Sequence, residues 1–373
     1  MRIAVPTEIK NNEFRVAITP VGVSELVRRG HEVYVQSGAG EGSLIPDEDF
    51  AAQGATIVKD AAETWAVGEM VMKVKEPIAS EYGHLRDDLV LYTYLHLAAD
   101  RPQTDALLEA GTTAIAYETV QLPSGLLPLL YPMSEIAGCL APQVGAHALM
   151  KAQGGRGTLM GCIGGVPNAK VVVLGGGTAG QNAANIAMGM GANVTILDTD
   201  LEKLRATFWR FHNQVAGVAS SALSIAEHVT QADLVIGTVL VPGAKAPKLV
   251  SNDLVAEMKP GSVLVDVAID QGGCFEDSHP TTHDDPTFEV HDSLFYCVAN
   301  MPGAVPHTST WALTNATLPY AIQLADKGAM QAMRDDRSLA KGLNTWAGHV
   351  THPGVASAFD LPLMSLDEAL DHG

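Results

Sequence analysis

The amino-acid sequence predicts an α/β protein of two domains, each with a mostly parallel sheet covered by helices. Three observations favour this class. The chain has 373 residues, which is long for a single hydrophobic core. Short apolar runs alternate with segments of helical pattern, as in sheets whose parallel strands are joined by helices. The alternation stops at a glycine-rich loop, residues 154–169, and then restarts, which indicates a second unit of the same kind.

The first half of the chain contains five apolar runs with the length and composition of buried strands. They lie at 2–6, 31–38, 70–74, 89–96 and 112–118. A helix is expected over 20–30, where Gly30 would end it, and another over 102–111. A long helical stretch follows at about 133–155, with Ser134 as its expected N-cap.

The second half repeats this pattern. Its expected strands lie at 170–175, 193–198, 232–240, 262–269 and 294–303, the last including its exit loop. One helix should run to Met190, and another should cover about 308–327 before an irregular tail. We therefore expect one discontinuous domain from residues 1–130 and 306–373, and a second from 131–305.

Composition excludes several classes of protein. The net charge of -19 argues against nucleic acid and anionic membranes as partners. The four cysteines form no closely spaced pair, so we expect neither a disulfide framework nor a thiol metal site, and no other metal motif is present. The first residues lack the hydrophobic region of a signal peptide, and no stretch is uniformly apolar enough to span a bilayer. These features favour a cytoplasmic protein.

A glycine motif after the predicted strand at 170–175 is the strongest indication of function. Gly175, Gly177 and Gly180 fit the GxGxxG pattern of dinucleotide-binding folds. The first glycine permits a tight turn, the second lets the backbone approach a pyrophosphate, and the third allows close packing of helix on strand. Asp198 ends the next strand, where a carboxylate can bind ribose hydroxyls. The alternative is a glycine turn that binds no ligand.

The acidic residues after this motif favour NAD over NADP. A carboxylate at Asp198 would repel a 2′-phosphate, and Asp200 would add to the repulsion. Lys203 and Arg205 lie nearby and act in the opposite sense.

Three cationic residues in the first domain suggest an anion site. Arg15 lies in a polar loop, Lys75 stands at the end of the strand that begins at Met70, and His96 ends the strand at 89–96. The carboxyl ends of parallel strands face the ligand crevice of an open sheet. Lys73 and Lys75 alternate with valines and should share one face, with Lys75 nearer that crevice. Each residue alone also has an ordinary explanation, as a surface arginine, a surface lysine or a core histidine.

In the second domain, the strand at 262–269 leads to Asp270, and two glycines follow it closely. We expect Asp270 to be functional and Asp266, inside the same run, to be structural.

A series of collinear segments gives the chain a clear resemblance. They are PTEIKNNEFRVAITP, VMKVKEP, LHLAA, PMSEIAG, GGGTAG, VLVPGAKAPKLV, DVAIDQGGCFE and YCVANMPGAVPHTST. Over essentially its whole length the chain resembles bacterial L-alanine dehydrogenases, and it is related to the nucleotide-binding subunit of proton-translocating transhydrogenases.

This resemblance implies two Rossmann-like, doubly wound parallel-sheet domains separated by a cleft, usually assembled as a homohexamer. It implies reversible oxidation of L-alanine to pyruvate and ammonium with NAD. Arg15 would bind the substrate carboxylate, Lys75 would contact the carbonyl or amino group, His96 would be the acid/base group, and Asp270 would act with water.

The resemblance also implies a set of NAD-binding residues. They are Ser134, Gly175, Gly177, Thr178, Ala179, Gly180, Asp198, Lys203, Ser220, Val239, Leu240, Val267, Ala268, Ile269, Asp270, Val298, Ala299, Asn300 and Met301. The match is weaker around Ser220, and His279 stands where the family has an arginine.

Two other functions fit parts of the sequence. A transhydrogenase subunit would pass hydride to an NADP held by a partner and would need no acid/base residue. An NAD-binding sensor or scaffold would need none of the four residues at 15, 75, 96 and 270. The presence of His96 together with Lys75 favours the dehydrogenase.

Overall fold

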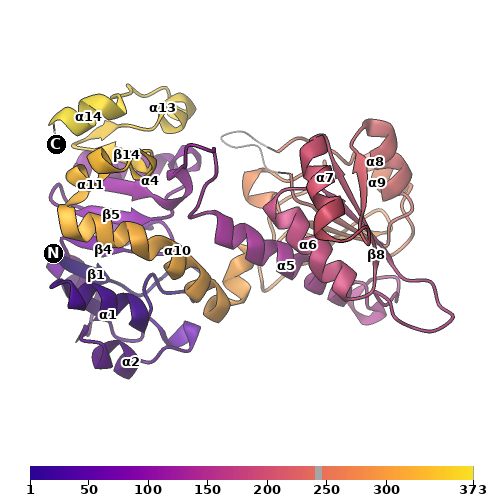
Figure 1. Ribbon diagram of the computed structural model, residues 1–373, viewed down its shortest axis with the longest axis horizontal. Coiled ribbons are helices and arrows are strands. Elements are labelled where there is room, and N and C mark those ends of the chain that lie inside the picture. Colours follow the sequence, from indigo (N-terminus) through magenta and orange to yellow (C-terminus); the bar gives the residue numbers. More distant parts are fainter. Residues whose placement is uncertain (240–245, 373) are drawn as a thin grey trace. The chain divides into compact units, whose positions relative to one another are not determined.

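The computed structural model describes residues 1–239 and 246–372. The chain forms two compact units, one from Met1–Met133 with Val305–Gly373 and the other from Ser134–Ala304 (Figure 1). The first boundary falls inside helix α5, Tyr131–Ala148. The expectation that Ser134 is the N-cap of this helix was wrong, because the helix begins three residues earlier.

Unit 1 contains an eight-stranded sheet in the order β15-β14-β6-β5-β4-β1-β2-β3. Its strands are β1 Arg2–Val5, β2 Glu32–Gln36, β3 Thr56–Val58, β4 Met70–Met72, β5 Val90–Thr93, β6 Thr113–Ala116, β14 Leu343–Trp346 and β15 His349–Val350. Strands β1 to β6 are parallel, while β14 runs antiparallel to β6 and β15 antiparallel to β14. The order reverses between β1 and β4, as in a doubly wound fold.

Helices connect and cover the strands of unit 1 (Figure 1). They are α1 Pro20–Arg28, α2 Asp47–Ala52, α3 Ala61–Val67, α4 Arg101–Ala110, α10 Pro306–Lys327, α11 Ala329–Asp335, α12 Arg337–Ala340, α13 Pro353–Phe359 and α14 Leu366–His372. The Asp100 carboxylate caps α4 by accepting the N–H of Gln103, and Gly111 ends the helix at a φ of 69°. The tail after α10 contains helices α11 to α14 and strands β14 and β15, so the expectation of an irregular tail was wrong.

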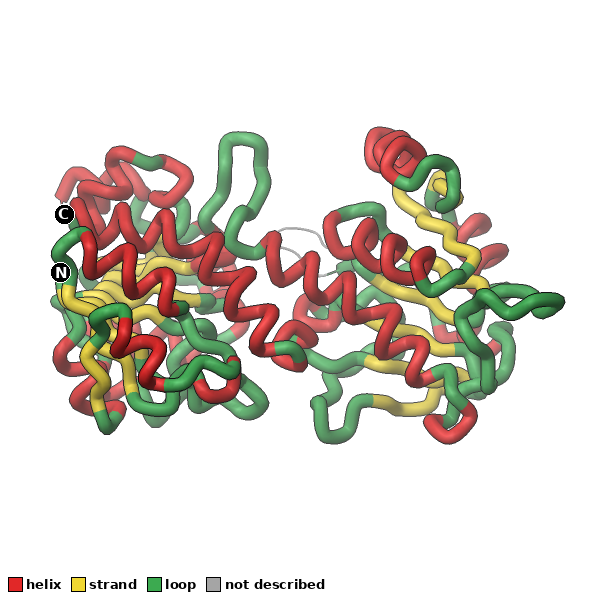
Figure 2. Tube along the Cα trace, turned by 60° about the horizontal axis from the view of Figure 1, so that its bottom comes forward, coloured by secondary structure: helices red, strands yellow, loops and turns green. Residues whose placement is uncertain are grey.

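Unit 2 contains a seven-stranded sheet in the order β12-β13-β11-β10-β7-β8-β9. Its strands are β7 Lys170–Leu174, β8 Asn193–Asp198, β9 Ala216–Ala219, β10 Leu234–Gly237, β11 Val263–Asp266, β12 Thr287–Val290 and β13 Ser293–Tyr296. All pairings are parallel except that of β12 with β13. Besides α5, its helices are α6 Thr178–Gly189, α7 Leu201–Arg210, α8 Ala222–Val229 and α9 Asn252–Ala256, which are labelled in Figure 1 and drawn red with the other helices in Figure 2.

The central strands of unit 2 are buried on both faces. On β7, Val171 and Val173 pack into one apolar cluster, and Val172 and Leu174 pack into another. Parallel sheets covered by helices on both sides have this property, which is why their strands read as continuous apolar runs. The prediction of two Rossmann-like α/β domains is confirmed. Among the described residues no helix is long and apolar enough to cross a membrane.

Candidate active site

The candidate residues of unit 1 lie on loops that follow neighbouring parallel strands. Arg15 follows β1, Lys75 follows β4 and His96 follows β5. Strands β1, β4 and β5 are adjacent in the sheet, so these loops leave it at the same carboxyl edge. The strands are shorter than expected: β4 ends at Met72 and β5 at Thr93, so neither Lys75 nor His96 ends a strand.

Arg15 is a buried residue, held in place by a carboxylate. Its side chain is 2% exposed, and its Nε and Nη2 donate to Oε1 and Oε2 of Glu13, both at 2.6 Å. Its Nη1 lies 3.1 Å from the sulfur of Met133. Burial alone would lower the pKa of Arg15, but the paired Glu13 carboxylate more than offsets this, and the pKa lies above its ordinary value. The interpretation as a solvated surface arginine is therefore wrong.

Lys73 and Lys75 differ in their surroundings. Lys73 is 1% exposed, and its Nζ lies 3.1 Å from Oε2 of Glu8 and 2.9 Å from Oε1 of Glu81. Oε1 of Glu8 also accepts the N–H of Val74 at 2.6 Å. The buried ion pairs thus fix the backbone just before Lys75, whose own side chain is partly exposed. Lys73 therefore has a structural role, and of the two lysines Lys75 is the one whose side chain meets solvent.

His96 occupies an unusual backbone conformation. Its φ of 51° and ψ of 35° lie in the left-handed region, which residues with a Cβ rarely adopt. Its side chain is 44% exposed, and its ring stacks on Tyr94 with centroids 5.9 Å apart. Glu118, which follows β6, accepts the His96 N–H at Oε1 at 2.6 Å. His96 is therefore not a buried core histidine.

In unit 2, the loop from β7 to α6 has the geometry that its glycines allow. Gly175 has a φ of 105°, and a Cβ on Gly180 would lie 1.8 Å from the carbonyl oxygen of Gly175. A Cβ on Gly177 would meet nothing within 4 Å, so that position is open to a ligand. Gly177 is also the N-cap of α6, whose first N–H groups can bind a phosphate. These residues fit a dinucleotide.

Thr238 supports this loop, although no motif in the sequence points to it. Its Oγ1 donates to the carbonyl oxygens of Leu174 and Gly175, at 3.0 and 2.9 Å. A Cβ on Gly175 would also lie 3.1 Å from Cγ2 of Val239, so Val239 lies beside the loop. Leu240 lies outside the described residues.

Asp198 ends β8 next to the glycine loop. Its Oδ2 accepts the N–H of Gly176 at 2.7 Å, and its Oδ1 accepts the N–H of Asp200 at 2.8 Å. Nζ of Lys203 lies 3.6 Å from Oδ2, and the N–H of Ser220 donates to the Asp198 carbonyl at 3.0 Å. The pairing of β8 with β9 brings Ser220 to Asp198, and the first turn of α7 brings Lys203 to it.

Ser134 lies on a helix that passes close to the glycine loop. It lies one helical turn before Gly138 on α5, and a Cβ on Gly138 would lie 2.3 Å from the carbonyl oxygen of Ala179. Helix α5 therefore passes close to the start of α6, near Thr178 and Ala179.

The segments after β11 and β13 meet at Asp270 and Asn300. The N–H of Asn300 lies 3.4 Å from Oδ1 of Asp270, whose side chain is exposed. Several other predicted cofactor residues have side chains turned into the apolar clusters, where only their backbone could contact a ligand. They are Ala268, Ile269, Val298 and Met301. Val267 and Ala299 are partly exposed.

Asp266 and His279 lie near this segment. Asp266 is fully buried, and its Oδ2 accepts from the Ser278 hydroxyl at 2.6 Å and from the Cys274 N–H at 2.8 Å, in keeping with a structural role. The ring of His279 packs on Phe288 with centroids 3.7 Å apart.

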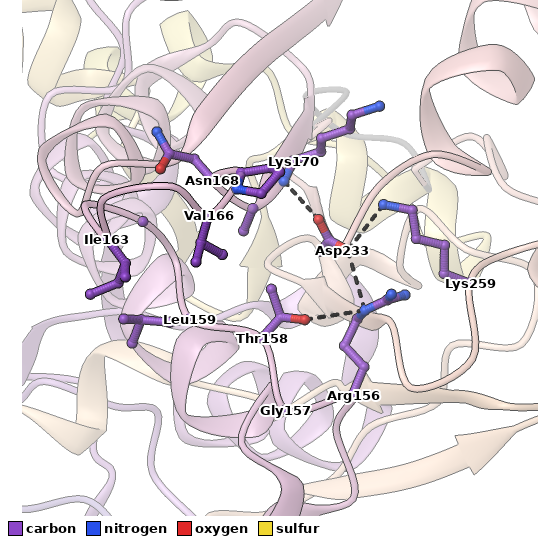
Figure 3. A pocket seen from close by; sticks show the side chains of 13 residues that line it. Arg156, Gly157, Thr158, Leu159, Ile163, Val166, Asn168, Lys170, Asp233 and Lys259 are labelled. Carbon is purple, nitrogen blue, oxygen red and sulfur yellow. Dashed lines mark hydrogen bonds and ion pairs between the residues drawn. The ribbon is translucent and has the colours of Figure 1, made fainter.

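A separate pocket of about 480 Å³ contains none of the predicted residues (Figure 3). It lies where strands β7 and β10 begin, at the sheet edge opposite the glycine loop. Asp233 lies there between Arg156 Nε at 3.3 Å and Lys259 Nζ at 3.0 Å, and it accepts the N–H of Lys170 at 2.8 Å. These contacts connect Arg156 and Lys259, which lie on loops, with the first residue of β7 and the residue before β10. Among the described residues no cluster of His, Cys, Asp or Glu side chains could hold a metal ion.

Comparisons with known proteins relate both units to one family. Residues 4–137 match the model of the alanine dehydrogenase/PNT N-terminal domain, and residues 141–353 match that of the C-terminal domain.

Individual relatives cover nearly the whole chain. Alanine dehydrogenase from Mycolicibacterium smegmatis is 62% identical over 97% of this chain and 98% of that protein. Alanine dehydrogenase from Mycobacterium tuberculosis is 63% identical with the same coverage. Alanine dehydrogenase 2 from Staphylococcus aureus is 54% identical over 99% of this chain and 100% of that protein.

Two solved structures of related proteins are similar to this chain over nearly its whole length. An L-alanine dehydrogenase superposes with a TM-score of 0.94 at 50% identity, covering 96% of this chain and 99% of that one. A transhydrogenase from Sinorhizobium meliloti superposes with a TM-score of 0.78 at 26% identity, covering 95% and 99%. The chain therefore belongs to the alanine dehydrogenase/PNT family and is an oxidoreductase.

Proposed function

We propose that this chain is an NAD-dependent L-alanine dehydrogenase, which converts L-alanine, NAD and water reversibly into pyruvate, ammonium, NADH and a proton. The main support is that Arg15, Lys75 and His96 lie on loops that follow adjacent strands of one sheet. The chain is also 62% and 63% identical to two alanine dehydrogenases. Residues 1–130 with 306–373 would bind the substrate, and residues 131–305 would bind NAD.

The substrate carboxylate would bind to Arg15. A guanidinium presents its N–H donors in a rigid planar fork that matches the two oxygens of a carboxylate. Lys75 would hold the substrate's amino group or carbonyl oxygen and balance negative charge there. Groups fixed in this way gain their effect from orientation, since the cost of ordering them was met during folding.

His96 would move the protons. Loss of the Cα hydride leaves an iminium ion, and water adds to its carbon. His96 would accept a proton from that water, giving a carbinolamine, and return it to the nitrogen. The nitrogen then leaves as ammonia while the hydroxyl gives its proton to the neutral His96 and becomes the carbonyl. Imidazole suits both steps because its ordinary pKa lies near neutrality. Asp270 would orient the water.

The residues around the glycine loop would hold the cofactor. The pyrophosphate would lie against Gly177 and the first turn of α6, and the ribose hydroxyls would donate to Asp198. Asp198 would disfavour the 2′-phosphate of NADP. Bound NAD would supply the acceptor for the hydride of the Cα–H bond.

A direct assay tests the proposal. Purified protein mixed with NAD and L-alanine should form NADH, and pyruvate with ammonium should consume it. The variant His96→Ala should bind NAD as the wild type does but lose about 10²- to 10⁴-fold in turnover. Turnover near the wild-type rate in this variant would remove His96 from the mechanism.

The alternative is a soluble subunit of a proton-translocating transhydrogenase. It is supported by the likeness to the transhydrogenase from Sinorhizobium meliloti, but at 26% identity against 50% for the L-alanine dehydrogenase structure. Such a subunit would transfer hydride only together with its partner subunits. NADH formation by the purified chain with L-alanine therefore separates the two.

We also infer a cytoplasmic homohexamer, on the basis of the family resemblance. Light scattering of the purified protein should then give six times the chain mass of 39.2 kDa. A monomer or dimer at working concentration would contradict this.

A further inference from the structure

We propose that Glu118 is a positioning residue for His96. It would hold the histidine's backbone in the left-handed conformation and turn its imidazole so that one ring nitrogen faces the substrate. This inference rests on the proposed role of His96 as the acid/base group.

The first observation is the set of hydrogen bonds that Glu118 makes beyond β5. Its Oε1 accepts the His96 N–H at 2.6 Å, and both oxygens lie 3.2 Å from the Leu95 N–H. These two N–H groups follow the last residue of β5, where the sheet no longer supplies partners. A carboxylate that accepts several N–H bonds fixes them more firmly than a neutral group would.

The sheet explains how a residue so distant in sequence reaches this loop. Strands β5 and β6 are parallel neighbours, with Thr93 paired to Ala116. Glu118 lies two residues past that pair and His96 three residues past it, so the two loops start side by side. Glu118 is only 14% exposed, so its carboxylate is confined to this position.

The second observation is the backbone conformation of His96. A φ of 51° is unfavourable for a residue with a Cβ, and such conformations persist where surrounding contacts enforce them. The bonds to Glu118 hold the N–H groups of two successive peptide units, Tyr94–Leu95 and Leu95–His96, immediately before the His96 Cα, and they provide that enforcement. Without them, the chain at His96 could relax to an ordinary conformation, which would move the ring.

The third observation concerns the ring itself. Nδ1 of His96 lies 3.9 Å from Oε1 of Glu118, and the ring lies nearly parallel to that of Tyr94, at an interplanar angle of 8°. With Nδ1 on the Glu118 side, Nε2 is the nitrogen left to exchange protons with the substrate. A carboxylate behind an imidazole also stabilises the imidazolium formed during the reaction, as in Ser-His-Asp triads.

Other charged or titratable groups face this pair. His352 and Tyr94 lie near Glu118, and Glu76 lies near His96. None of the three is hydrogen-bonded to the His96 backbone in the part of the chain that the structure describes, so the positioning role falls to Glu118.

The test is a double-mutant cycle on the full-length enzyme, with Glu118→Gln, His96→Ala and the double variant. Glutamine keeps an acceptor for the backbone but removes the charge, and a thermal melt checks that each variant folds. We expect Glu118→Gln to lower kcat about 10- to 100-fold, with the KM for L-alanine and the Kd for NAD changed less than about threefold. In the His96→Ala background the same substitution should have no further effect on kcat.

Two controls sharpen this result. Asp105→Asn makes the same carboxylate-to-amide change at an exposed ion pair with Arg101 and should leave kcat unchanged. Glu118→Ala removes the acceptor as well and should lower kcat further than Glu118→Gln. The solvent isotope effect on kcat should rise in Glu118→Gln, because proton transfer becomes slower than the other steps, and a merely structural role would not raise it.

Each outcome decides the proposal. A Glu118→Gln variant with wild-type kcat, or one that loses the same factor with and without His96, would overturn it while the proposed function stood. A wild-type protein inactive on L-alanine would overturn the proposed function and, with it, this inference. Wild-type turnover in His96→Ala would refute the role of both residues.

Discussion

At the scale of single residues, buried glutamates orient the cations that the sequence singled out. Glu13 pairs with Arg15 through both of its oxygens, and neither side chain is more than 2% exposed. The spacing of the two residues is visible in the sequence, but their burial is not. A polar loop such as 11–15 is ordinarily solvated, so only the packing of the folded unit shows that this arginine is held inside it.

Replacing Glu13 should therefore destabilise the protein. Glu13→Ala removes the carboxylate that compensates a buried guanidinium, and breaking a buried pair in this way costs about 3 to 5 kcal/mol. Urea unfolding should show this loss. Glu25→Ala is the matched control, since Glu25 pairs with Arg28 on the surface, with side chains 35% and 69% exposed, and should cost less than about 1 kcal/mol. Equal losses in both variants would contradict the importance of burial.

At the scale of elements, the glycine loop between β7 and α6 depends on close backbone contacts. A Cβ on Gly180 would lie 1.8 Å from the Gly175 carbonyl oxygen and 2.9 Å from the Thr238 hydroxyl. Gly180→Ala must therefore displace the loop, and we expect NAD affinity to fall at least about tenfold, as measured by calorimetry, together with a lower melting temperature.

A second glycine on the same helix provides the control for this substitution. Gly189 ends α6, and a Cβ there would meet nothing within 4 Å. Gly189→Ala should leave NAD affinity unchanged and stabilise the helix by about 0.5 to 1 kcal/mol. If both variants lost NAD binding equally, the effect would not come from the loop contact.

The loop before α13 should make stability depend on pH. Burial lowers the pKa of His352 below its ordinary value of 6.5, with Glu118 acting in the opposite sense, and its Nδ1 has no hydrogen-bond partner among the described residues. The folded state thus favours the neutral ring, while the unfolded chain takes up a proton near pH 6.5. The stabilisation is complete above that pH and decreases as the pH falls below it.

His352→Gln should remove part of this dependence. The free energy of unfolding, compared between about pH 7.5 and about pH 5.5, should fall less in this variant than in the wild type. His349→Gln, at an exposed histidine on β15, should keep the wild-type difference. A pH dependence unchanged in His352→Gln would show that other groups cause it.

The elements that sequence could predict are those buried on both faces. Runs such as 170–174 are apolar at nearly every position because helices cover both sides of a parallel sheet. Strand β14 is different: Leu343–Trp346 contains Asn344 and Thr345, and it pairs with β6 across more than two hundred residues of sequence. No local pattern identifies such a strand. The same holds for Glu118 and Thr238, whose roles depend on which strands are neighbours.

At the scale of the whole molecule, the glycine motif, Asp198 and Ser220 all lie in unit 2, and Arg15, Lys75 and His96 all lie in unit 1. Each unit has its own sheet and apolar clusters. A ligand that binds one unit should stabilise that unit first, because it shifts the folding equilibrium only of the structure that it contacts. This gives a test of which unit holds NAD that does not depend on turnover.

Hydrogen exchange with and without NAD makes the comparison. At about 100 times its Kd, NAD should stabilise unit 2 by about 2.7 kcal/mol, which slows amide exchange there about a hundredfold wherever exchange requires that unit to unfold. The amides of β7, β8 and β10 should show this slowing, while those of β1, β4 and β5 should exchange as before. At the same NAD concentration, Gly180→Ala should reduce this slowing by at least about tenfold, and Gly189→Ala should preserve it. Slowing confined to unit 1 would place the cofactor there instead and would contradict the assignment of residues 131–305 to NAD.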